Sequence, residues 1–61
     1  MAIVYLANGK SISVNESVDQ IQDAITDLGS ATTPMIRLTE LGSNQPALVF
    51  AANIVSIQDL G

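Results

Sequence analysis

The sequence contains neither cysteine nor histidine. Without cysteine the chain forms no disulfide, and without either residue type the usual ligands of a structural zinc ion are missing. Catalysis by a serine–histidine or cysteine–histidine pair is excluded as well, because there is no imidazole or thiolate. We therefore expect a protein that is not an enzyme and that has no cofactor and no metal ion.

Positive charge and aromatic side chains are equally scarce. Lys10 and Arg37 are the two cations, against six carboxylates, and the formal net charge is -4. Nucleic-acid binding needs clustered Lys and Arg to neutralise phosphates, and acidic lipid surfaces are disfavoured for the same reason. Tyr5 and Phe50 are the only aromatic residues, which leaves few platforms for stacking bases. We expect neither nucleic acid nor a membrane as partner.

Charged residues make up only 13% of the sequence, whereas hydrophobic residues make up 48%. A soluble domain normally carries about 25% charged residues. The 61 residues form a single small domain, 1–61, and a domain of this size buries only about 60% of the surface exposed in its unfolded form. Such domains usually need a disulfide, a metal ion, unusually good packing or self-association for stability, and the first two are excluded. The composition therefore favours a homo-oligomer.

The apolar run at the N-terminus covers residues 1–7. It is too short to span a bilayer, and it lacks the basic flank of a signal peptide. We therefore expect a cytoplasmic protein.

The first half of the chain begins with a predicted β-hairpin. Residues 3–7 (Ile-Val-Tyr-Leu-Ala) are typical of a strand, and residues 11–14 alternate strictly between polar and apolar side chains. Between them, Asn8-Gly9 is the pair best suited to positive φ at both corners of a two-residue type I′ turn.

An amphipathic helix is predicted next. Ser17 and Gln20 have the spacing of a capping box, so we expect the helix to begin there. Its apolar face has the helical spacing of three and four residues and consists of Val18, Ile21, Ala24, Ile25 and Leu28. Gly29 is placed to end the helix in the left-handed conformation.

The second half predicts only strands and loops. We expect a loop at 29–34, strands at 35–39, 47–51 and 54–58, a hairpin loop at 40–46 and a bend at 52–53. Thr33 should be extended, because a proline follows it. The predicted fold class is α+β: an N-terminal β-hairpin, one amphipathic helix, then two to three antiparallel strands (ββαβββ), with the helix on one face of the sheet.

Two of the predicted strands are apolar on both faces. In the first strand, one face consists of Ile3, Tyr5 and Ala7, and the opposite face consists of Val4 and Leu6. In the second strand, one face consists of Leu48 and Phe50, and the opposite face consists of Ala47, Val49 and Ala51. A single helix can cover only one face of a four- or five-stranded sheet, so the pattern predicts that a second subunit covers the other. Half-exposed aliphatic residues on a monomer are the alternative interpretation.

The helix also carries three carboxylates at successive four-residue intervals, Asp19, Asp23 and Asp27. Neighbouring like charges at this spacing repel each other by a few tenths of a kcal/mol. The stripe is either a docking site for a basic partner or a cation, or a solvated helix face. It is a poor calcium site, because calcium takes six or more oxygen ligands.

Three further residues are candidate contacts with a ligand or partner. Arg37 lies in the middle of a predicted strand, where it could pair with Glu40 or another carboxylate at the sheet edge, or bind an anion in a groove between subunits. Tyr5 and Phe50 are candidates for the core or for a subunit interface.

Residues 6–21 resemble the strand, Asn-Gly turn, strand, Glu-Ser cap and helix of small swarming-motility and flagellar accessory proteins of the FlbD type. Residues 49–57 are similar to the other half of those proteins, in reversed order, and together the two segments cover less than half of the chain. Such modules also recur in small phage-encoded proteins. The resemblance implies an accessory protein without catalysis and assigns no functional residues.

These observations together predict a non-catalytic, oligomeric accessory or regulatory module of possible phage origin. It would act by binding a protein partner, or by enclosing a small ligand between its subunits. The alternative is an acidic inhibitor that occupies the basic site of a host enzyme. An enzyme built on carboxylates alone is the least favoured interpretation.

Overall fold

The structure, a computed structural model, describes residues 1–29 and 34–60. Within this part of the chain it is an α+β fold with the order ββαβββ, as predicted. The strands are β1 (Ala2–Leu6), β2 (Ser11–Val14), β3 (Met35–Thr39), β4 (Pro46–Phe50) and β5 (Ile54–Asp59). The helix α1 (Val18–Leu28) follows β2, and a single 3-10 turn, η1 (Ala51–Asn53), precedes β5. The expected extended conformation of Thr33 lies outside the described residues.

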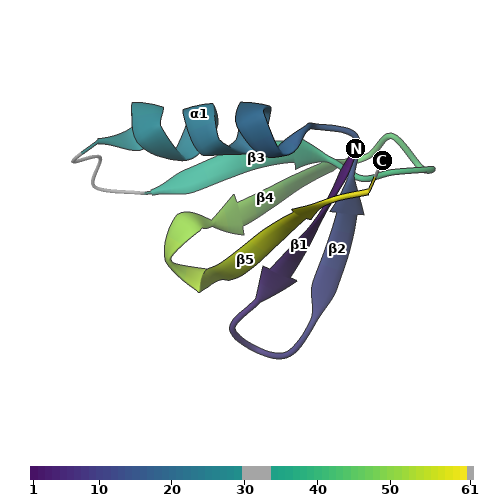
Figure 1. The fold of residues 1–61 in the computed structure, drawn as a ribbon, viewed down its shortest axis with the longest axis horizontal. Helices are drawn as coiled ribbons and strands as arrows, with labels where there is room; N and C mark the ends of the chain where they lie inside the picture. The colour runs from purple at the N-terminus through teal and green to yellow at the C-terminus, as the bar shows by residue number, and fades with distance from the viewer. Residues whose placement is uncertain (30–33, 61) are drawn as a thin grey trace.

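The described strands form two antiparallel sheets rather than one. One sheet has the order β2-β1-β5, and the other consists of β3 and β4. They meet at one corner, where Val14 of β2 and Glu40 form an isolated bridge. Figure 1 shows the strands fanning out from this corner below α1. β2 and β3 meet at this bridge and form no continuous ladder among the described residues.

The β1–β2 hairpin is present, but its turn differs from the prediction. Leu6 N–H donates to the Lys10 carbonyl at 2.8 Å, and Gly9 N–H donates to the Leu6 carbonyl at 3.1 Å. Of the expected pair only Gly9 has a positive φ, 85°. The loop therefore spans residues 7–9, the three-residue form that ends in a left-handed glycine. The Asn8 side chain contributes by accepting a hydrogen bond from Lys10 N–H at 3.0 Å.

The predicted capping box begins α1. Gln20 N–H donates to the Ser17 hydroxyl at 3.1 Å, and the Gln20 side chain accepts from Ser17 N–H at 2.8 Å. At the other end Gly29 N–H donates to the Thr26 carbonyl. Gly29 has the expected positive φ of 53°, but its ψ of -121° lies outside the left-handed helical region. The cap thus uses the freedom of glycine in a different conformation from the one expected.

The core lies between the two sheets and is closed by α1. Its fully or nearly fully buried residues come from both sheets and the helix: Ala2, Val4, Val14, Ile21, Ile36, Leu38 and Val49. The helix packs against β3 and β5, one strand from each sheet. The inner faces of the two sheets therefore contribute to one core, and the outer faces are turned toward solvent.

Candidate functional site

The outer face of the β3–β4 hairpin exposes large apolar side chains to solvent. Its cross-strand pairs are Met35–Phe50, Arg37–Leu48 and Thr39–Pro46. We call these six residues the β3–β4 outer face. Leu48 is 65% exposed and Phe50 is 50% exposed, although the alternating residue Val49 is buried in the core. Leu48 and Phe50 therefore lie on the face opposite Val49, as predicted, whereas Ala51, predicted as the last residue of this strand, lies in η1.

Arg37 lies at the centre of this face. It is exposed and stands directly opposite Leu48, with the Met35–Phe50 pair on one side. No ion pair joins it to Glu40 within the described residues, so that predicted pairing is wrong. Residues three apart on a strand point to opposite sides, and the Glu40 carboxylate instead accepts a hydrogen bond from the Ser43 hydroxyl at 2.9 Å. Arg37 is the one cation on an otherwise uncharged surface.

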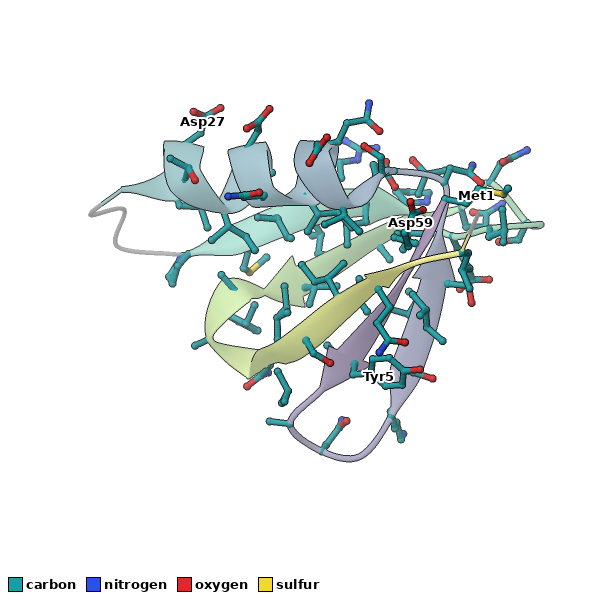
Figure 2. All side chains as sticks on the ribbon, viewed as in Figure 1. Met1, Tyr5, Asp27 and Asp59 are labelled. Carbon is teal, nitrogen blue, oxygen red and sulfur yellow. The ribbon has the colours of Figure 1, made fainter. Side chains whose placement is uncertain are left out.

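The outer face of the three-stranded sheet has a different composition. Tyr5, which is 38% exposed, lies between Ser11 of β2 and Ser56 of β5. Ile3 is likewise flanked, by Ser13 and Gln58. Figure 2 shows Tyr5 near the turn end of the β1–β2 hairpin, well away from α1. The structure thus brings Arg37 and Phe50 together but places Tyr5 on the other sheet.

The predicted acidic stripe is exposed along α1. Asp19, Asp23 and Asp27 are all accessible to solvent, and Figure 2 shows Asp27 on the side of the helix turned away from the strands. Asp19 lies in the first turn, where the helix dipole favours negative charge. No group of three or more potential metal-ligating side chains occurs among the described residues. The stripe is therefore a line of exposed negative charge and does not form a metal-binding site with other described side chains.

Glu16 joins the two sheets through hydrogen bonds that sequence reasoning missed. Both of its carboxylate oxygens accept from Thr39 N–H, at 2.9 and 3.1 Å. Burial alone would raise the pKa of the Glu16 carboxyl, but the hydrogen bonds from the backbone N–H groups of Thr39 and of Glu16 itself outweigh it and lower the pKa. The bond crosses from the β2–α1 connection to the end of β3, so its role is to hold the corner where the sheets meet.

A second surface, the α1–β5 groove, was also missed. It has a volume of about 300 Å³ and is lined by Val18, Gln22, Ile25, Thr26, Ile54, Val55, Ser56 and Ile57. Val55 is 68% exposed and lies where the β1–β5 register shifts, between the partners of Tyr5 and Leu6. Sequence reasoning did not include Gln22 or Thr26 in the apolar face of the helix. It had no signal for the groove, because the groove depends on where β5 lies relative to α1.

No helix in 1–29 or 34–60 is long and apolar enough to cross a membrane. Scans against models of known families, against curated proteins and against solved structures each found no match for this chain.

Proposed function

We propose that this protein is a non-catalytic binding module that associates with itself through the β3–β4 outer face. The observation that carries the proposal is the exposure of Leu48 and Phe50, at 65% and 50%, next to Met35 on a two-stranded sheet. Burying an exposed side chain of this size against a partner contributes about 1.5–3 kcal/mol. A small domain without disulfide or metal gains stability when such a surface is covered.

A second copy suits this face because the face has little charge to oppose it. The aspartates of the acidic stripe lie on α1, and Arg37 is the one charged residue among the six of the outer face. In a two-fold dimer the same patch is used on both subunits, so that Leu48 and Phe50 meet their counterparts. The β4 strand also has a single neighbour, β3, among the described strands, and pairing of its other edge would extend the sheet.

Arg37 gives such a dimer a place for a small anionic ligand. Two-fold symmetry brings the guanidinium groups of both subunits to the same interface, where they would repel each other. A carboxylate or phosphate between them offsets that repulsion and accepts hydrogen bonds from both forks. This arrangement supports a ligand enclosed between subunits, as the position of Arg37 in the sequence suggested.

The wider setting that we propose is an accessory or regulatory role in the cytoplasm, with a phage origin. Its support is the resemblance of residues 6–21 to FlbD-type accessory proteins, together with the absence of cysteine and histidine from the sequence. The resemblance itself stays a prediction.

An acidic inhibitor of a host enzyme is the second candidate. The observation that favours it is the exposure of Asp19, Asp23 and Asp27 along one helix that carries no basic residue. These charges would enter a basic site, and binding would weaken steeply with salt. Replacing all three aspartates by asparagine would abolish such inhibition but leave self-association through the β3–β4 outer face unchanged.

Sedimentation velocity over a range of micromolar concentrations tests the leading proposal. We expect a dimer or larger assembly that dissociates on dilution, and Phe50→Ser should shift it to monomer. Tyr5→Ser is the matched control, because it removes the other aromatic residue from the other sheet. A wild-type protein that sediments as a monomer throughout would refute self-association.

A further inference from the structure

The α1–β5 groove follows the edge of a strand rather than the face of a sheet. Ile54, Val55, Ser56 and Ile57 all line it, and they are consecutive residues. Consecutive side chains of a regular strand point to opposite faces, and the register shift at Val55 changes this alternation at one position, so four residues in a row border the same groove where it runs along the strand edge. β5 has β1 as its single hydrogen-bonded neighbour among the described strands. The edge that borders the groove is the one opposite β1.

The ladder between β1 and β5 shows which backbone groups this edge presents. Leu60 N–H donates to the Met1 carbonyl at 3.1 Å, which makes Met1–Leu60 a hydrogen-bonded pair. Such pairs alternate along an antiparallel ladder with pairs whose N–H and C=O groups point outward. Counting along the register, Val4–Ile57 is one of the latter. The Ile57 N–H and C=O therefore point away from β1, toward the groove.

The helical rim of the groove is negatively charged. Asp19 lies three residues before Gln22, and Asp23 lies three residues before Thr26, so each is a surface neighbour of a lining residue. The two cations of the sequence lie elsewhere, Lys10 beside the β1–β2 turn and Arg37 on the β3–β4 outer face. The groove therefore combines an apolar lining, an open strand edge and an acidic border.

We propose that the α1–β5 groove binds an extended peptide segment of alternating apolar and basic residues, which adds to β5 as a further antiparallel or parallel strand. Its backbone pairs with the outward N–H and C=O of Ile57. Its apolar side chains contact Ile25 and Val55, and its Lys or Arg side chains reach Asp19 and Asp23. Strand addition of this kind takes affinity from the main chain and specificity from alternate side chains. A second copy of this chain suits the groove less well, because its net charge of -4 repels the rim.

A peptide of alternating valine and lysine, slightly longer than β5 and capped at both ends, tests the proposal by fluorescence anisotropy. We expect saturable binding that weakens as salt is added, because the rim charges are exposed. A peptide of alternating valine and glutamate is the control for charge and should bind at least about tenfold more weakly. Equal binding of the two peptides would overturn the proposal.

Two matched pairs of variants place the site. Val55→Lys should weaken binding of the valine–lysine peptide about tenfold or more, because it removes an apolar contact and adds a like charge. Leu41→Lys places the same charge at an exposed apolar residue that belongs neither to the groove nor to the β3–β4 outer face, and it should leave peptide binding unchanged. Asp23→Asn should weaken binding a few-fold, whereas Asp27→Asn, on the side of α1 away from the strands, should have less effect. If the control variant of either pair weakened peptide binding more than the groove variant did, the peptide would bind elsewhere and the assignment would be overturned.

The mode of binding has its own readout. In an added strand every second N–H faces β5, so methylating the valine amides and methylating the lysine amides should have opposite effects. One methylated peptide should lose binding and the other should retain most of it. The Ile57 amide should also become protected from hydrogen exchange when the peptide binds. Equal effects of the two methylations, or hydrogen exchange of the Ile57 amide that the peptide leaves unchanged, would overturn strand addition.

Discussion

The outer faces of the two sheets differ, although the strands that supply their apolar residues look alike in the sequence. On the three-stranded sheet, Tyr5 lies between Ser11 and Ser56, so polar side chains surround the exposed apolar residues of β1. On the other sheet, Phe50 lies opposite Met35, so the neighbour reinforces the pattern of β4. An exposed apolar strand becomes an apolar surface only when the strand beside it contributes to the same face.

The largest expected effect is the difference in stability between variants on the inner face and variants on the outer face of β3–β4. Leu38 is 1% exposed and Leu48 is 65% exposed. Leu38→Ala should lower the free energy of unfolding by about 2–5 kcal/mol, because it leaves a cavity in the core. Leu48→Ala should change it by less than about 0.5 kcal/mol in the dissociated protein. Urea denaturation at low protein concentration measures both, and similar losses for the two variants would contradict the assignment of the faces.

The second-largest expected effect is a difference between the two outer faces in their contribution to self-association. Phe50→Ser should raise the dissociation constant of the oligomer at least about tenfold, because burying an aromatic side chain contributes about 1.5–3 kcal/mol. Tyr5→Ser should change it less than about twofold. Sedimentation equilibrium gives both constants, and the proposed interface would have to move to the other sheet if Tyr5→Ser had the larger effect.

Making the polar face resemble the apolar one is the converse experiment. The double variant Ser11→Leu, Ser56→Leu surrounds Tyr5 with apolar side chains at exposed positions. We expect new or tighter association, by a few-fold to about tenfold, because a contiguous apolar patch replaces an isolated one. Light scattering against the variant Ser11→Thr, Ser56→Thr, which keeps the hydroxyls, measures the gain. If the leucine variant did not associate more tightly than the threonine variant, the apolar or polar character of the side chains alone would not explain the difference between the two faces.

The smallest effect concerns the corner that joins the sheets. Because hydrogen bonds lower the pKa of Glu16 in the folded protein, this residue contributes stability at pH values above its unfolded pKa of about 4.3. That contribution is lost as the pH falls through the lower, folded pKa. Glu16→Gln should therefore be slightly less stable than wild type near neutral pH and should lose less stability on acidification. Parallel stability curves of the two proteins below pH 5 would show that the carboxylate does not act as described.

Local signals predicted the elements well because neighbouring residues determine them. The capping box at Ser17 and Gln20 formed as expected, and so did the hairpin before it. The turn of that hairpin was predicted wrongly, since Asn8-Gly9 is compatible with both a two-residue and a three-residue loop. The register of the flanking strands decides between the two loops, and it pairs Tyr5 with Ser11.

The candidate site was only partly predictable. Arg37 and Phe50 were identified as unusual in the sequence, and the structure places both on the β3–β4 outer face. The groove beside Val55 was not identified, because its walls come from α1 and β5, which are far apart in the chain. The hydrogen bonds of Glu16 to Thr39 were missed for the same reason.

The sequence by itself determined the order of the elements, the two-sided apolar pattern of β1 and β4, and the absence of cysteine and histidine chemistry. These properties follow from residue type, local periodicity and turn composition, which do not depend on distant contacts. Only the tertiary structure decided that the strands divide into two sheets and that serines flank Tyr5 while Met35 lies opposite Phe50. It also decided that the edge of β5 opens beside α1. Strand pairing sets these relations, and pairing joins residues whose separation in the chain carries no local signal.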